Sequence, residues 1–109
     1  MKLFANWDTL ENIPLELMDR KIFTGENVML TRHIVKPSVA MAPHKHPHEQ
    51  ILVVLSGECD VTTGDVTEHL TPGGLALFPS NVEHSFINTL DEELILLDIF
   101  APIREDFLK

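Results

Sequence analysis

The chain of 109 residues has few basic side chains, one cysteine and no long apolar run, and each shortage excludes a class of protein. Eight basic residues oppose seventeen acidic ones, and the net charge of −9 repels phosphates and anionic lipid, so we expect no nucleic acid and no membrane as partner. The single cysteine, Cys59, permits no internal disulfide and fits a reducing compartment. The longest apolar run, Ile51–Leu55, is far shorter than a membrane span, and the N-terminus lacks the apolar core of a signal peptide. We therefore expect a cytoplasmic protein.

The rest of the composition is typical of a single globular domain. Hydrophobic residues make up 44% of the chain and charged residues 23%, and we expect one domain over residues 1–109. Breaker residues divide the sequence into short segments that resemble strands, namely Arg20–Phe23, Val28–Val35, Glu49–Leu55, Glu58–Thr62, Val66–Leu70, Leu75–Phe78, Glu83–Thr89 and Glu93–Ala101. So many short strands predict an all-β sandwich or barrel with little helix. Before them, Asp8 could cap one helical turn.

The last segment, Glu93–Ala101, is apolar on both faces. Alternation along a strand gives one face with Leu94, Leu96, Asp98 and Phe100, and a second face with Ile95, Leu97 and Ile99. One face can fill the interior of the domain. The other needs a cover, for which we expect a second copy of the chain in a homodimer. A monomer whose second layer covers the strand is the alternative.

The segment from Pro43 to Gln50 contains the first chemical signal, two histidines separated by one residue. On an extended chain, His44 and His46 point to the same side, and a pair of imidazoles forms half the coordination sphere of a transition metal. For a bare pair of this kind, a polar loop with solvated imidazoles is the favoured interpretation. Its interpretation therefore depends on what else lies at a fixed spacing.

Further residues lie at characteristic sequence spacings from this pair. Gln50 follows His46 by four positions and Gly57 follows Gln50 by seven, and a later group comprises Gly73, Pro79, His84 and Asn88. This pattern resembles the two motifs of the cupin superfamily, G-x5-H-x-H-x3-or-4-E-x6-G and G-x5-P-x-G-x2-H-x3-N. The chain departs from them at three positions, because Ser38 and Asn81 replace glycines and Gln50 replaces a glutamate. Asparagine tolerates the left-handed conformation that a glycine supplies.

The resemblance implies a conical β-barrel, or jelly roll, with a barrel core at about residues 28–101 and a tail at 102–109. It also implies one divalent metal ion inside, with His44, His46, Gln50 and His84 as ligands. Zinc, nickel, cobalt, manganese and iron all accept imidazoles and an amide oxygen. An amide in place of a carboxylate leaves the ion a full dication and a stronger Lewis acid.

Alternatives remain open for the ligand set. Three histidines alone could hold the metal, with Gln50 outside the coordination sphere, whereas strand parity points Glu49 away from the Gln50 side. His48 is expected at the rim. His33 and His69 are expected at ordinary surface positions.

The C-terminal run from Leu96 to Phe107 resembles one group of cupins, those of pectin degradation, which convert 4,5-unsaturated galacturonate from its cyclic to its linear keto form. Asp98, Phe100 and Arg104 fall on that group's D-x-F-x3-R pattern, which implies a catalytic role for all three and an anionic substrate. The group has an aromatic residue where this chain has Leu52 or Val53, which leaves the exact substrate open.

The same residues can be interpreted without the family. A carboxylate on an apolar strand is costly unless it is paired or faces a polar cavity, and Arg104 could hold a substrate carboxylate. The alternative is a structural Asp98–Arg104 pair, with Phe100 a plain core residue. Arg32 could add positive charge to the pocket or lie at the surface. Acidic neighbours would raise the pKa of Cys59, which argues against a thiol nucleophile.

The sequence thus favours a metal-dependent isomerase that opens or tautomerises the ring of a sugar acid. The runner-up is a metal-dependent dioxygenase of the quercetin or diketone type, against which Gln50 counts. A metal- or ligand-binding cupin without enzymatic activity is the third possibility. The tyrosine base of the sulfoniopropionate-cleaving cupins is excluded because the chain has no tyrosine.

Overall fold

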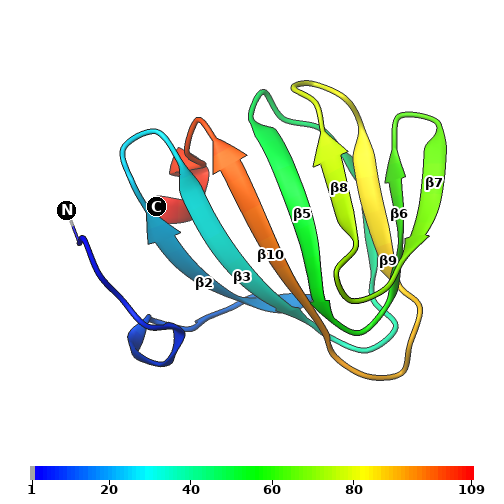
Figure 1. Cartoon of the computed structure of the whole chain (residues 1–109), viewed down its shortest axis with the longest axis horizontal. Coiled ribbons are helices and arrows are strands. Elements are labelled where there is room, and N and C mark those ends of the chain that lie inside the picture. Colours follow the sequence, from blue (N-terminus) through cyan, green and yellow to red (C-terminus); the bar gives the residue numbers. More distant parts are fainter. Residues whose placement is uncertain (1) are drawn as a thin grey trace.

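Two antiparallel sheets enclose one interior in the computed structural model, which describes residues 2–109 (Figure 1). The six-stranded sheet has the order β1 (Ile13–Pro14), β2 (Met18–Thr24), β3 (Met29–Val35), β10 (Leu94–Ala101), β5 (Glu49–Ser56) and β8 (Leu75–Phe78). The four-stranded sheet has the order β4 (Ala40–His44), β9 (His84–Asn88), β6 (Cys59–Thr63) and β7 (Val66–Leu70). Within residues 2–109, helix is confined to two 3-10 turns, η1 (Trp7–Thr9) and η2 (Glu105–Leu108). The expectation of an all-β jelly roll with little helix is confirmed.

The eight predicted strands are all present, and no end is shifted by more than two residues. Strands β1 and β4 were not predicted from the sequence. β4 contains Pro43, which is tolerated because β4 lies at the edge of its sheet, where a residue without a backbone N–H can be accommodated. The expectation that Asp8 caps the first helical turn is wrong. Asn6 occupies the cap, and its side-chain oxygen accepts a hydrogen bond of 2.8 Å from the backbone N–H of Asp8.

Non-glycine residues occupy the left-handed region at the two motif positions that have lost glycine. Ser38 has a φ of 60° and Asn81 a φ of 62°. The expectation that Asn81 tolerates this conformation is confirmed, and the turn geometry of the motif survives both replacements.

The interior divides into an apolar end and a polar end along the same strands. On β10 the inward residues are first Leu94 and Leu96, both buried, then Asp98, which is 4% exposed, and last the buried Phe100. The neighbouring strand β3 runs antiparallel and pairs Thr31 with Asp98. This division gathers polar side chains at one end of the barrel, above a core of aliphatic and aromatic residues.

The outer face of β10, β5 and β8 is apolar as well. Ile51, Leu75 and Leu77 are 40%, 67% and 50% exposed there, and Ile51 pairs with both Ile99 and Leu77.

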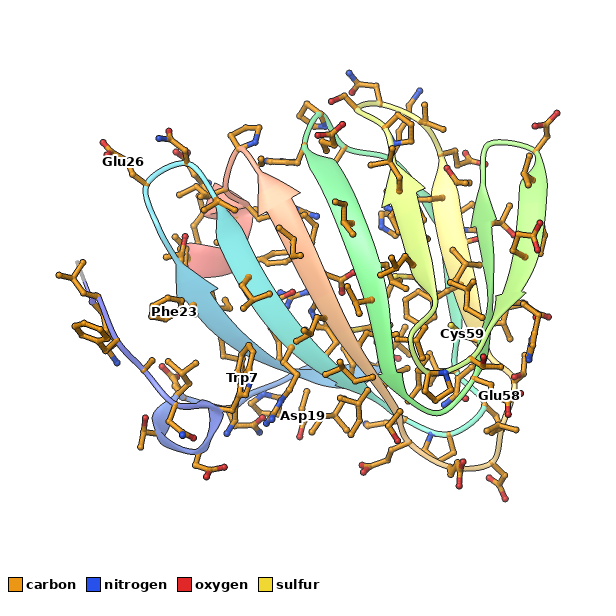
Figure 2. The ribbon with its side chains drawn as sticks, in the orientation of Figure 1. Trp7, Asp19, Phe23, Glu26, Glu58 and Cys59 are labelled. Carbon is orange, nitrogen blue, oxygen red and sulfur yellow. The ribbon has the colours of Figure 1, made fainter. Side chains whose placement is uncertain are left out.

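Arg32, on the neighbouring strand β3, also faces outward. Its guanidinium lies 5.1 Å from the ring centre of Trp7, so Arg32 does not reach the pocket. Trp7 belongs to the N-terminal segment beside β2 and β3 (Figure 2). No helix within residues 2–109 is long and apolar enough to cross a membrane.

The turn at Gly57 offers a test of the fold. Its φ is 87°, and a Cβ there would lie 3.1 Å from the backbone oxygen of Glu93 and 3.2 Å from Cα of Leu94. We predict that Gly57→Ala lowers the free energy of unfolding by about 1–3 kcal/mol, measured by urea denaturation. Gly25→Ala is the control, because its Cβ would meet its nearest atom at an ordinary 3.4 Å. Equal losses in the two variants would contradict this account of the turn.

Candidate metal centre and its pocket

Three histidines from separate positions in the chain converge at the polar end of the barrel. His44 ends β4, His84 begins β9, and these two residues are register partners. His46 lies in the loop between β4 and β5. Ring nitrogens of the three imidazoles lie within 4.8 Å of one another, so the structure brings together the three histidines that the motif spacing singled out.

A backbone carbonyl fixes each of the three rings. The Nδ1 atoms of His44, His46 and His84 lie 3.0, 3.0 and 3.1 Å from the oxygens of Ala42, His48 and Val82. A carbonyl oxygen only accepts, so each Nδ1 carries the proton and donates it. In a neutral ring, Nε2 is then left with a lone pair. This is how proteins orient imidazoles that bind a metal.

The environment of the buried rings of His46 and His84 favours the neutral imidazole, which is the form that binds a metal ion. Burial, with smaller contributions from the neighbouring rings of His44 and His46, lowers the pKa of His84 to about 4. Burial, followed by the charge of Arg104, also lowers the pKa of His46. Among the described residues, the buried Nε2 of His84 has no hydrogen-bond partner. Such an unpaired lone pair is costly in an interior, and a transition-metal ion would satisfy it. The donor set therefore fits a divalent ion.

Gln50, on β5, presents its amide oxygen to this cluster. Its Oε1 lies 3.0 Å from Nε2 of His46, while its Nε2 donates to Oδ1 of Asp98 at 2.8 Å. Two ligands at about 2.1 Å from one ion and at right angles are about 3.0 Å apart, so the spacing suits a shared metal. Glu49 is exposed on the opposite side of the strand.

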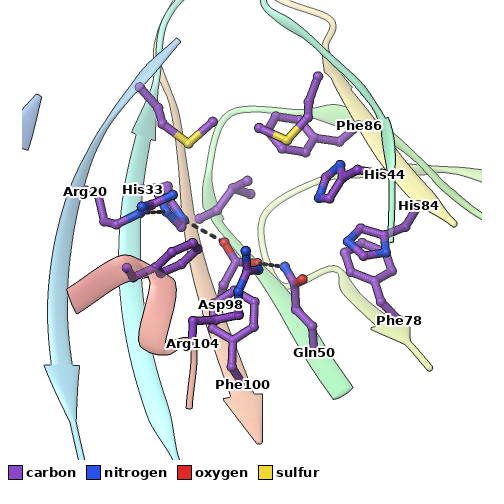
Figure 3. Close-up of a pocket in the computed structure, with 14 residues that line it drawn as sticks. Arg20, His33, His44, Gln50, Phe78, His84, Phe86, Asp98, Phe100 and Arg104 are labelled. Carbon is purple, nitrogen blue, oxygen red and sulfur yellow. Dashed lines mark hydrogen bonds and ion pairs between the residues drawn. The ribbon is translucent and has the colours of Figure 1, made fainter. Parts of the chain in front are cut away.

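The cluster opens into a cavity of about 120 Å³ that also contains the residues of the C-terminal motif (Figure 3). Asp98, Phe100 and Arg104 line it together with His44, His84 and Gln50. The alternative of a structural Asp98–Arg104 pair is wrong. Arg104 instead donates from Nε and Nη2 to the two carboxylate oxygens of Asp106, at 3.0 and 2.9 Å.

Asp98 is paired with a histidine that the sequence analysis placed at the surface. His33 is only 5% exposed, and its Nδ1 lies 2.7 Å from Oδ2 of Asp98. The expectation for His33 is wrong because β3 turns every second residue inward, from Met29 to Val35. Strand parity could have revealed this. His69 does lie at the surface, where its ring contacts Glu58 and Asp60.

Two further residues of the pocket were not singled out from the sequence. Arg20, on β2, lies opposite His33 in the sheet and lines the cavity. Phe107, on η2, covers the pocket, with the Arg20 guanidinium 3.5 Å and the Arg104 guanidinium 4.2 Å from its ring centre. No motif carries either residue, and their proximity depends on strand pairing and on the return of the C-terminal tail.

Cys59 is excluded as a nucleophile. It is fully buried, and burial, with a further contribution from Asp60, raises the pKa of its thiol to about 11. A thiol with such a pKa is not ionised near neutrality.

The geometry agrees with comparisons to known proteins. The family model Cupin_2, the cupin domain, matches residues 31–100, and the chain belongs to this family. It is 34% identical over 92 residues to the pectin degradation protein KdgF of Dickeya dadantii, with 82% of each protein covered. It is 42% identical over 66 residues to the H2HPP isomerase of Bacillus subtilis, of which it spans only 28%, while 60% of this chain is covered. An RmlC-like cupin from Shewanella frigidimarina superposes with a TM-score of 0.90 at 26% identity, covering 98% of this chain and 96% of the other.

The position of Gln50 yields a test of the ligand set. We predict that Gln50→Ala lowers the affinity for Co²⁺ about tenfold or more, measured by competition with a chelator, because one oxygen donor is lost. Glu49→Ala should leave the affinity unchanged, since its side chain is exposed on the other side of β5. The reverse pattern would show that the assignment of inward and outward faces on β5 is wrong.

Proposed function

We propose that this cupin is a metal-dependent isomerase that opens the ring of an unsaturated uronate, or a related sugar acid, to its linear keto form. One observation carries the proposal most strongly. A buried carboxylate, that of Asp98, lies in the same small cavity as Arg104 and two imidazoles of the three-histidine cluster, those of His44 and His84. Two relatives support the reaction class, since one is named an isomerase and another a pectin degradation protein.

The three histidines and Gln50 are the residues that would hold the metal. A divalent ion of zinc, nickel, cobalt, manganese or iron at this position would supply Lewis acidity toward a substrate oxygen. All four ligands are neutral, so none offsets the charge of the ion. Gln50 therefore favours polarisation of a hydroxyl or carbonyl over the oxygen chemistry of a dioxygenase.

Asp98 is the group that would move the proton. Its carboxylate takes the proton from the anomeric hydroxyl, the bond between the anomeric carbon and the ring oxygen breaks, and the proton returns to the alkene carbon as the enol becomes a ketone. No atom is gained or lost, so the reaction needs no oxidant or co-reactant. The hydrogen bonds from His33 and Gln50 hold the carboxylate in place for this transfer.

Arg104 and Phe100 would bind the sugar acid. The guanidinium lies 5.2 Å from the ring centre of Phe100, so an anionic group and a sugar face can be held side by side. Arg20 adds a second cation in the pocket. Together they provide the local positive charge that an anionic substrate needs on a protein with a net charge of −9.

Turnover tests this proposal. We predict that the metal-loaded protein removes the ultraviolet absorbance of 4,5-unsaturated galacturonate well above the spontaneous rate, and that a chelator abolishes this activity. Asp98→Asn should lower kcat by about 10²-fold or more, because the proton-transfer group is lost. Full turnover by Asp98→Asn would refute its role. Oxygen consumption without loss of the enol ether would instead favour the dioxygenase.

The exposed outer face of β10, β5 and β8 supports the proposal of a homodimer. We predict that the protein elutes with twice its chain mass of 12.3 kDa, measured by light scattering, and that Leu77→Lys yields the monomer. Ile87→Lys is the control, because Ile87 is equally exposed but belongs to β9 in the other sheet. A wild-type monomer would show that this face needs no partner.

A further inference from the structure

A chain of hydrogen bonds crosses the pocket from β2 to β5 and ends at the metal-binding residues (Figure 3). Nε of Arg20 lies 2.9 Å from Nε2 of His33, and Nδ1 of His33 lies 2.7 Å from Oδ2 of Asp98. Gln50 then donates to the other oxygen of Asp98. His33, Gln50 and Asp98 are 5%, 7% and 4% exposed, so water does not replace these contacts.

Arg20 determines which nitrogen of His33 carries the proton. The Nε of a guanidinium always bears a hydrogen and can only donate, so Nε2 of His33 must accept and cannot carry a proton of its own. The ring is therefore neutral and protonated at Nδ1. The Nδ1–H group then donates to Asp98, which is the one orientation that makes both bonds favourable.

The effect continues through Asp98 to Gln50. With one oxygen of the carboxylate held by His33, the other oxygen faces Gln50 and accepts from its NH2 group. This fixes the orientation of the amide, because its nitrogen is turned to Asp98 and its oxygen to Nε2 of His46. A flipped amide would set its oxygen against the carboxylate of Asp98, so the bond to Asp98 decides the orientation and leaves the amide oxygen on the side of the imidazoles.

We propose that Arg20 and His33 are positioning residues, which act through Asp98 to hold the Gln50 oxygen toward the three imidazoles and the carboxylate toward the cavity. Neither residue touches the candidate metal position, and the proposal does not depend on which substrate is bound. Arg20 and His33 fix which nitrogen of His33 is protonated and how the Gln50 amide is oriented. Both features are present before any ligand binds.

The first test is the protonation of His33 in the metal-free protein, read from ¹⁵N NMR of its ring. We expect a protonated, pyrrole-like Nδ1 and a bare, pyridine-like Nε2. Arg20→Met should remove this pattern, because Nε2 no longer faces a donor and can take a proton. Arg32→Met is the control, since Arg32 lies on β3 but packs against Trp7 on the outer face. A wild-type ring that carries its proton on Nε2, or on both nitrogens, would overturn the proposal.

The second test compares two replacements of His33 by their affinity for Co²⁺. His33→Asn keeps an N–H group near the position of Nδ1, whereas His33→Leu keeps similar bulk but cannot donate. We expect the leucine variant to bind Co²⁺ about tenfold more weakly and the asparagine variant to stay within about threefold of wild type. Equal affinities in the two variants would contradict the proposal, as would a leucine variant that matches wild type.

The NMR and Co²⁺ measurements test the positioning role of Arg20 and His33 independently of the proposed uronate reaction. If the protein fails to act on the uronate, the NMR pattern and the Co²⁺ affinities still decide whether Arg20 and His33 position the site. If the leucine variant fails to fold, the comparison of Arg20→Met with Arg32→Met decides the question alone. In the active enzyme, His33→Leu should lower kcat more than His33→Asn.

Discussion

Polar side chains buried at one end of a β-barrel need partners, and the rest of this structure depends on how that need is met. A buried polar group without a hydrogen bond destabilises the fold, and the buried imidazoles of His46 and His84 each donate to a backbone carbonyl, as does the more exposed ring of His44. These hydrogen bonds leave the Nε2 atom of each ring available, and ring nitrogens of the three histidines lie within 4.8 Å of one another. The pairing that satisfies the fold thus also creates a site for a metal, and the unpartnered Nε2 of His84 marks where the ion is needed.

The same constraint explains why the carboxylate of Asp98 can lie on an otherwise apolar strand. Its two oxygens accept from His33 and Gln50, so its charge is stabilised by neighbours on β3 and β5. Arg104 therefore makes no hydrogen bond to Asp98 and is paired with Asp106 instead. The pocket is lined by one carboxylate held in place by hydrogen bonds and by the guanidinium of Arg104, which suits the proposed transfer of a proton within an anionic sugar.

Much of this architecture could be predicted from local patterns. Alternation along the strand predicted that Asp98 and Phe100 share one face of β10, and the resemblance to the cupin motifs predicted that His44, His46 and His84 meet. The predictions failed where a contact depends on pairing between distant strands. His33 faces Asp98 because β3 and β10 are neighbours in one particular register, and Arg20 faces His33 for the same reason between β2 and β3. No spacing within a single segment contains that information.

The central claim is that the three imidazoles and the Gln50 oxygen form one metal site beside Asp98. The most direct test is a crystal structure of the protein loaded with one equivalent of Co²⁺, in which anomalous diffraction locates the ion. The account predicts a single ion per chain, bound by Nε2 of the three histidines and by Oε1 of Gln50. An ion bound instead at the surface, between His69 and the carboxylates of Glu58 and Asp60, would contradict it.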